Sequence, residues 1–553
     1  MIDVAMSPGC GMTEVRSSAR PSPTRAWLWA RLPWWLAIAA AFTALFVQLS
    51  VRVGRLQSPL QGDDMMYFLD GLDRLEQFRS NGLRGVVVGY LDRPPHSPWS
   101  SFVAAGSFAL FGLKEWAPFL GNGLLIVVLV GFVDFLAIGR GRWSRRFCLF
   151  MACTAPFAAQ GVMQFRPDFA AGLLTAIGIV LLLRHNFAES AKGYQAAAGA
   201  SFGLALLAKP TGSPFTLGIT IGTLVLAGIC DRVTRRGLTL GSIAASWAWC
   251  LGPMVVLAAP HYALAWRNVA EVVALNTFSP QAEVWRMSGG QPFPWYYYVT
   301  GLGGRMMLRN HLYLFAAICL ASSAFVVRAR EWEAIIRHLA FALVLMVAWG
   351  IPTMLGSFSP FFTQTFVVLL LFSAVLAVCD VLPRVPLDGT RFPWARGLAV
   401  AGAVVVPFIG IASRTSGVAP DPAQIRLHHE IYRDVLRRVR ASSGGRPARV
   451  FLTCNGDIAP ETLTWLARKE GLDASFRAEE ISTDPEVFRG EIDRSSLVLA
   501  VTTRGNGKVH PWLPSAEVAD TVLAMVRSRP DFREVAALGP LGTKEYYLFA
   551  RDQ

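Results

Sequence analysis

Runs of about 20 apolar residues with almost no charge recur along the first three quarters of this chain. Each run is long enough to cross the roughly 30 Å of hydrocarbon in a bilayer as a helix. The runs are continuous rather than alternating, which favours helices over the strands of a closed barrel. Only 16% of the 553 residues are charged, against about a quarter in soluble domains. The sequence therefore predicts an α-helical polytopic membrane protein.

The basic residues predict the orientation of the spans. The net charge of +14 comes from arginines placed between apolar runs, which is typical of positive-inside bias and argues against nucleic-acid binding. An arginine cluster at 140–146 is expected in the cytoplasm, so residues 52–116 are expected outside. This alternation of inner and outer loops gives about eleven spans. Their approximate bounds are 33–51, 117–138, 147–164, 169–184, 194–208, 212–230, 238–260, 310–327, 338–356, 361–379 and 397–413.

The same alternation of inner and outer loops divides the chain into regions. Residues 1–32 are predicted to be a cytoplasmic tail before an uncleaved first span, because the apolar run that follows is long and lacks a clear cleavage site. Residues 33–414 form the transmembrane domain, with outer loops at 52–116 and 261–309. Within the first loop, residues 97–112 are apolar but too short to cross, and we interpret them as an interfacial or re-entrant helix.

Residues 415–553 are charged and hold no span. Helices are predicted at 421–441, 460–469 and 514–527, and strands at 449–454, 497–502 and 546–550. Alternation of this kind predicts a small periplasmic α/β domain. No GxGxxG or P-loop occurs in it, so no nucleotide site is expected. Of the eight cysteines only Cys454 lies here, so the domain is expected to have no internal disulfide.

Two adjacent acids, Asp63 and Asp64, stand at the start of an amphipathic stretch in the first outer loop. One interpretation is a general base held at the membrane surface, with the neighbouring acid raising its pKa. The other is structural: Asp63 is an N-cap, and Asp64 is a first-turn acid favoured by the helix dipole. The residues alone leave both open.

The first outer loop ends in a second polar group. Arg93 and His96 flank the pair Pro94-Pro95, which forces an extended chain. The two side chains could face a polar head group, or the segment could be a turn with a surface histidine.

Other charges lie at the outer ends of spans. Arg166 and Asp168 flank a proline in a tight turn, and Lys209 ends a span. Charges so close to a bilayer are functional candidates, and a lysine there can bind a lipid phosphate or extend to ordinary head groups. Arg305 and Arg309 follow an aromatic group at 295–298 that suits either an interfacial belt or a sugar site. No spacing singles out a metal-ligand set, and a divalent metal stays open.

Together these features resemble the GT-C glycosyltransferases, in the branch of dolichyl-phosphate-mannose protein mannosyltransferases and undecaprenyl-phosphate aminoarabinose transferases. Four motifs match in order over residues 33 to about 212, while beyond them only the architecture agrees. They are the acidic pair with Tyr67, Pro94-Pro95 before a stretch ending Leu110-Phe111-Gly112, the turn Arg166-Pro167-Asp168, and Leu207-Ala208-Lys209-Pro210-Thr211-Gly212. One position departs: the family usually has His before the proline pair, where this chain has Arg93, and His96 follows the pair.

The resemblance implies an inverting transfer of a sugar from a polyprenyl-phosphate carrier to a lipid, glycan or protein acceptor of the envelope, at the outer face of a bacterial inner membrane. It implies Asp63 as the base and Asp64 or Asp168 as the residue that positions the acceptor. Arg166 and Lys209, with Arg305 or Arg309, would hold the departing phosphate. No cofactor is expected.

Two other functions stay open. A transporter or flippase of a lipid-linked saccharide would need charged groups within the spans near the midplane, whereas the candidate charges lie at loop edges. A non-catalytic scaffold would keep its function after Asp63→Asn.

Overall fold

A computed structural model describes residues 25–60, 62–235, 237–278, 282, 295–354, 360–380, 422–454, 458–503, 513–541 and 543–552. The predicted span at 397–413 lies outside these residues, as do most of the predicted tail and residues 283–294 of the second outer loop.

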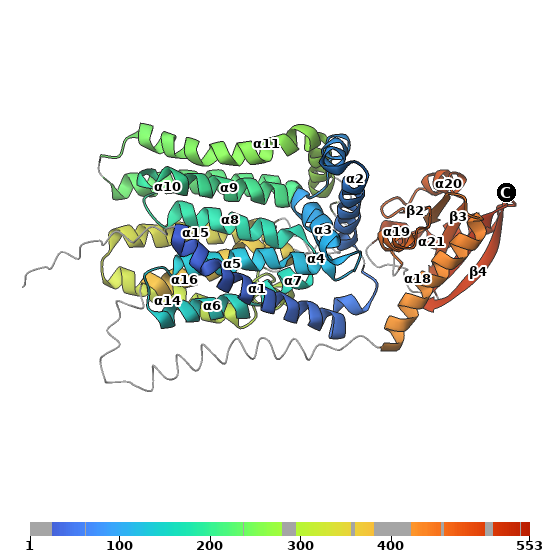
Figure 1. The fold of residues 1–553 in the computed structure, drawn as a ribbon, viewed down its shortest axis with the longest axis horizontal. Helices are drawn as coiled ribbons and strands as arrows, with labels where there is room; N and C mark the ends of the chain where they lie inside the picture. The colour runs from blue at the N-terminus through green and yellow to red at the C-terminus, as the bar shows by residue number, and fades with distance from the viewer. Residues whose placement is uncertain are drawn as a thin grey trace, which may run out of the picture.

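A bundle of long apolar helices makes up the membrane part (Figure 1). Every predicted span before the last coincides with one of these helices or with a bent pair. The helices are α1 (Arg25–Val53), α4 (Ala117–Gly121) with α5 (Gly123–Leu136), α6 (Arg142–Thr154) with α7 (Pro156–Met163), α8 (Pro167–Leu183), α9 (Lys192–Ala208), α10 (Ser213–Thr234), α11 (Leu240–Phe278), α14 (His311–Arg328), α15 (Trp332–Met354) and α16 (Gln364–Asp380).

Seven helices in the described part of the chain are long and apolar enough to cross a membrane, or eight if the bent pair α6–α7 forms one span. The pair bends by 48° at Ala155, because Pro156 lacks the amide that would continue the first helix and disfavours helical geometry in the residue before it. α8 is apolar but has only 17 residues. The chain is a multi-pass membrane protein, and the total of eleven spans stays a prediction.

One predicted span boundary falls within a helix. The seventh span was expected to end at Pro260, where the second outer loop was expected to begin, but α11 continues to Phe278. A proline inside a helix removes one hydrogen bond without always ending the helix. Residues 261–278 contain neither glycine nor another proline, so helix propensity carries α11 through the first part of the predicted loop.

The first outer loop folds into two helices at one end of the bundle, on the side of the C-terminal domain (Figure 1). The second, α3 (Pro98–Phe111), matches the predicted short helix and is not among the helices long enough to cross. The first, α2 (Asp63–Asp92), is interrupted at Asn81 and at Gly82, whose φ is 59°. This left-handed turn reverses the chain, because Gly85 on the second arm packs against the backbone of Gln77 on the first.

The C-terminal domain is a five-stranded mixed sheet with order β2-β1-β3-β5-β4 and helices on both faces. β1 pairs in parallel with β2 and β3, and β5 pairs antiparallel with β3 and β4. The strands are β1 (Ala448–Leu452), β2 (Ala474–Ala478), β3 (Leu497–Thr503), β4 (Phe532–Leu541) and β5 (Lys544–Arg551). The helices are α18 (Pro422–Ser443), α19 (Pro460–Lys469), α20 (Pro485–Asp493) and α21 (Ala519–Arg527).

The predicted α/β class of this domain is confirmed, and the elements missed by the sequence have a common cause. The three predicted strands are the central ones, whereas β2 and β4 are the two edges of the sheet. Edge strands are half exposed and lack a continuous apolar run, and only Phe476 is buried in β2. The short helix α20 was also missed, and the predicted helix 514–527 is a 3₁₀ turn (Pro514–Glu517) followed by α21.

Candidate functional site

The two adjacent acids of the first outer loop have opposite environments. Asp63 is the first residue of α2, and 56% of its side chain is exposed. Asp64 is fully buried. The N-cap is Gly62, with a φ of 70° and no side chain to cap the helix, so the interpretation of Asp63 as the N-cap is wrong. One acid is therefore available to a substrate, and the other belongs to the framework.

Two arginines from other segments neutralise these acids. Arg166, the N-cap of α8, places Nη1 3.2 Å from Asp63 Oδ2 and Nε 3.8 Å from Asp64 Oδ1. Arg55, in a short 3₁₀ turn (Arg55–Gln57) after α1, places Nη2 3.1 Å from Asp64 Oδ2. Phe361 covers the Arg166 guanidinium at 4.7 Å from its ring centre. The Arg166 contacts join the start of α2 to the turn between α7 and α8.

Burial is the largest influence on the pKa values of Asp64 and Tyr67. It raises the pKa of Asp64, while the charges of Arg55 and Arg166 act in the opposite direction and the charge of Asp63 raises it further. The sequence predicted that the neighbouring acid would raise one pKa, but burial is the larger cause. Burial also raises the pKa of Tyr67 well above 10, helped by Asp63, so its phenol stays protonated.

A second ion pair joins the next two helices of the bundle. Asp168 lies in the first turn of α8, and Lys209 is the C-cap of α9. Lys209 Nζ donates to Asp168 Oδ1, and Phe362 lies under the ammonium at 4.0 Å from its ring centre. The side chains are only 18% and 10% exposed. Both pairs thus have an aromatic residue from the same 3₁₀ turn, Pro360–Thr363, beside the cation.

The reversal of α2 brings His96 back beside the start of the helix. Its backbone amide donates to Asp70 Oδ2 at 3.2 Å, and its ring lies 6.2 Å from that of Tyr67. Burial lowers the pKa of His96, opposed by the charges of Asp70 and Asp63. Arg74 closes the hairpin by donating to the Arg93 carbonyl oxygen. His96 therefore stands next to the cluster although its sequence position departs from the motif.

This chain resembles known proteins in part of its sequence and in its fold. Residues 92–257 match the family described as dolichyl-phosphate-mannose-protein mannosyltransferase. The structure is similar to that of ArnT from Cupriavidus metallidurans in the apo state, with 16% identity, a TM-score of 0.53 and coverage of 93% of this chain and 98% of that chain. It is also similar to ArnT from the same organism bound to undecaprenyl phosphate, with 15% identity, a TM-score of 0.54 and the same coverage. No curated protein matches the sequence.

This chain has the fold of these two ArnT structures. The resemblance predicted from the sequence motifs is confirmed by the family match and by the fold. The family match includes the R-P-D turn and the lysine motif but begins after the acidic pair. The similarity that concerns Asp63 and Asp64 is therefore one of fold.

The remaining candidate residues lie around this cluster in different ways. Arg93 is the C-cap of α2 and its side chain is exposed. Arg309 follows the short helix α13 (Leu302–Met307) and has a φ of 53°. α13 contacts the Pro360–Thr363 turn that covers the two cations. Arg305 lies within α13, and its side chain is outside the described residues.

Three residues of the charged cluster were missed by the sequence analysis. Arg55 had no distinctive signal, because the predicted outer loop at 52–116 holds five other arginines. Phe361 and Phe362 had none, because aromatic residues at the end of a span are ordinary interfacial residues. Their position beside Arg166 and Lys209 is visible only in the fold.

Proposed function

We propose that this chain is a membrane glycosyltransferase that moves a sugar from a polyprenyl-phosphate carrier to an extracytoplasmic acceptor by inverting displacement. One observation carries the proposal. Asp63, Arg166, Asp168 and Lys209 come from three separate segments, yet they meet in two linked ion pairs at one end of the bundle. Tyr67 lies within electrostatic range of Asp63, Asp64, Arg166 and Asp168, so these charges belong to one cluster.

Asp63 is the proposed general base, because it is the exposed carboxylate of the cluster. Its carboxylate accepts the proton of an acceptor hydroxyl as that oxygen attacks the anomeric carbon. The bond between the anomeric carbon and the phosphate oxygen breaks, and its electron pair leaves with the polyprenyl phosphate. A single displacement of this kind inverts the anomeric configuration. The buried, ion-paired Asp64 is assigned the role of holding Arg166 in place.

Arg166 and Lys209 are the proposed ligands of the phosphate. Charge stabilisation by fixed cations acts on a leaving phosphate without acid catalysis. Asp168 would orient Lys209 between turnovers and share it with the phosphate when the donor binds. The solved ArnT with bound undecaprenyl phosphate has this fold, which supports a polyprenyl carrier as donor. No resident cofactor enters the proposal.

The proposed orientation places this cluster at the outer face of a bacterial inner membrane. Arg184 and Arg235 are the C-caps of α8 and α10, whereas Asp168 lies at the start of α8. Positive-inside bias assigns the arginine ends to the cytoplasm, and therefore the cluster to the opposite face. A flippase would need charges near the middle of spans, and the cluster lies at helix ends.

The test uses purified protein in proteoliposomes with a panel of radiolabelled undecaprenyl-phosphate sugars and an envelope extract as acceptor. Wild type is expected to transfer label from one donor, and Asp63→Asn is expected to lower kcat by about 10²–10⁴-fold. Asp92→Asn, at the exposed far end of α2, is the matched control and should behave as wild type. Turnover is expected to persist in EDTA. Equal turnover of Asp63→Asn and wild type would overturn the assignment of the base.

A further inference from the structure

The C-terminal domain inserts one side chain into the core of the membrane part. Trp465 of α19 is 1% exposed and belongs to the apolar core of the helix bundle rather than to the core of its own domain. Its ring is stacked on Phe108 of α3 at 5.1 Å and meets the edge of Phe68 of α2 at 5.6 Å. The contact therefore joins a residue near the C-terminus to the helix that begins with the acidic pair.

Phe68 links this tryptophan to the acidic pair Asp63 and Asp64 and also to Arg166. It lies one helical turn after Asp64. Its ring also meets that of Phe165 at 5.5 Å, and Phe165 directly precedes Arg166. A shift of Phe68 would consequently move the start of α2 relative to the arginine that pairs with Asp63 and Asp64.

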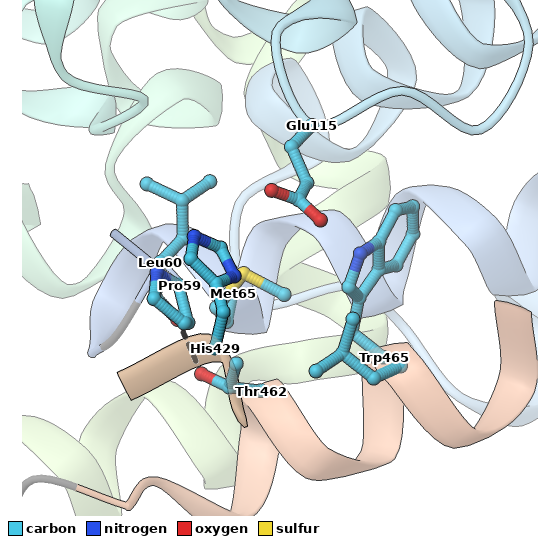
Figure 2. Close-up of a pocket in the computed structure, with 8 residues that line it drawn as sticks. Pro59, Leu60, Met65, Glu115, His429, Thr462 and Trp465 are labelled. Atoms are coloured by element: carbon cyan, nitrogen blue, oxygen red, sulfur yellow. Dashed lines mark hydrogen bonds between the residues drawn. The ribbon is translucent and has the colours of Figure 1, made fainter. Parts of the chain in front are cut away.

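The same domain holds the segment that carries Arg55. The Thr462 hydroxyl donates to the Leu60 carbonyl oxygen (Figure 2). His429 Nε2 forms a hydrogen bond of 2.8 Å with the Gln57 carbonyl oxygen. These two bonds fix the chain between Arg55 and the start of α2, and so fix the partner of Asp64.

Arg468 forms ion pairs with two acidic residues of α2. Its Nη1 lies 2.6 Å from Asp73 Oδ1, and its Nη2 contacts Glu76. Lys469 forms a looser pair with Glu115, at 3.6 Å. Paired charges at the rim of an interface set the register of the two surfaces, so Arg468 fixes how far along α2 the tryptophan inserts.

A cavity of about 20 Å³, large enough for one water molecule, lies at this contact (Figure 2). It is lined by Pro59, Leu60, Met65, Glu115, His429, Thr462, Trp465 and Leu466. The Trp465 Nε1 atom is buried and has no hydrogen-bond partner among the residues that the structure describes. The contacts that hold the tryptophan in the described chain are packing contacts, and phenylalanine can supply most of them.

We infer that the C-terminal domain is a positioning element of the catalytic site, acting through Trp465 on Asp63 and Arg166. The inference rests on the proposed function for the meaning of the site, and on the contacts above for the coupling. Trp465 touches no reacting group, so its effect is on the geometry of the base and its arginine. A displacement of about 1 Å in such a site can cost about 10²-fold in rate.

The first test compares two substitutions in the full-length protein. Trp465→Ala is expected to lower kcat about 10²-fold, whereas Trp465→Phe should stay within a few-fold of wild type. Val487→Ala, at an exposed position of α20 in the same domain, is the matched control. Wild-type kcat in Trp465→Ala would overturn the inference.

The second test needs no turnover, so it separates this inference from the proposed function. Amide hydrogen exchange in residues 55–72 is expected to rise in Trp465→Ala and to stay at the wild-type level in Trp465→Phe, with exchange in β1 and β3 unchanged in both. Unchanged exchange in residues 55–72 would overturn the positioning role. A wild type inactive on every donor, with the exchange result as expected, would count against the glycosyl transfer alone.

The third test reverses the charges at the rim. Arg468→Glu places an acid against Asp73 and Glu76 and is expected to lower kcat. Combining it with Asp73→Arg re-forms an opposite-charge pair and should restore part of the loss. Failure of the double substitution to recover any activity, with the C-terminal domain still folded, would contradict a role for this docking contact.

Discussion

Arg55 and Asp64 form an ion pair, 3.1 Å apart, in which the carboxyl group is fully buried and the guanidinium reaches it from the segment after the first span. Removing one partner of a buried pair leaves an uncompensated charge and costs about 3–5 kcal/mol. Arg55 is partly exposed and Arg166 remains nearby, so we expect Arg55→Ala to cost about 3 kcal/mol. Thermal unfolding in detergent measures this, with the exposed Arg52→Ala as control.

Lys209→Ala should raise the KM for the lipid donor. The lysine is the proposed phosphate ligand, and a hydrogen bond to a charged group contributes about 1.5–3 kcal/mol, or roughly 10–100-fold in affinity. Lys192→Ala, at the other end of α9, is the control. A donor titration in proteoliposomes that gave the same KM for all three proteins would remove Lys209 from the phosphate site.

His96 makes the stability of the protein depend on pH. Burial lowers its pKa below the ordinary 6.5 in the folded state. Below pH 6.5 the unfolded chain therefore binds more protons than the folded one, so this contribution to stability is complete above pH 6.5 and is lost as the pH falls. The difference in melting temperature between wild type and His96→Gln should change between pH 7 and pH 5. A constant difference would contradict a partly buried His96 that is neutral in the folded state.

Glu461 gives the opposite dependence. Burial raises its pKa above 4.5, and the charges of Glu480 and Asp63 add to the increase. The folded chain thus holds its proton to higher pH, so this contribution is complete below pH 4.5 and is lost as the pH rises. Glu461→Gln should raise the melting temperature at pH 7.5 by about 2 °C and have little effect near pH 4.5. Glu486→Gln on the exposed face of α20 is the control.

Gly85→Ala should open the hairpin of α2. An added Cβ would lie 2.2 Å from the Gln77 carbonyl oxygen on the opposite arm, and overpacking of this kind costs about 1–3 kcal/mol. The separation of the arms would also weaken the link between His96 and Asp70. We expect a lower melting temperature and lower turnover. Gly106→Ala in α3, where a Cβ would meet open space, should match wild type in both measurements.

The sequence located most candidates but not their environments. Asp63 and Asp64 are identical residues at adjacent positions, and one is half exposed while the other is buried. That difference depends on which side of α2 faces Arg55 and Arg166, and those residues come from other segments of the chain. The R-P-D turn and the lysine motif were found separately, and only the fold showed that Asp168 and Lys209 form a pair.

The docking of the C-terminal domain could not be predicted. Trp465 reads in the sequence as an apolar residue on an amphipathic helix of an α/β domain, and its expected place is the core of that domain. It lies instead between Phe68 and Phe108. A local sequence pattern cannot identify the packing partner of such a residue, because the contact joins segments almost 400 residues apart in the chain.

By itself, the sequence determined the class of the protein, the place of nearly every membrane helix in the described chain and the α/β nature of its C-terminal domain. These features follow from local patterns, because the bilayer demands about 20 apolar residues in each span and a packed sheet demands apolar central strands. Only the tertiary structure decided that Asp63 is the exposed carboxylate and that Arg166 pairs with it. It also decided that Trp465 packs beside the segments that carry these two residues. Burial and ion pairing depend on neighbours that the chain brings together from distant positions.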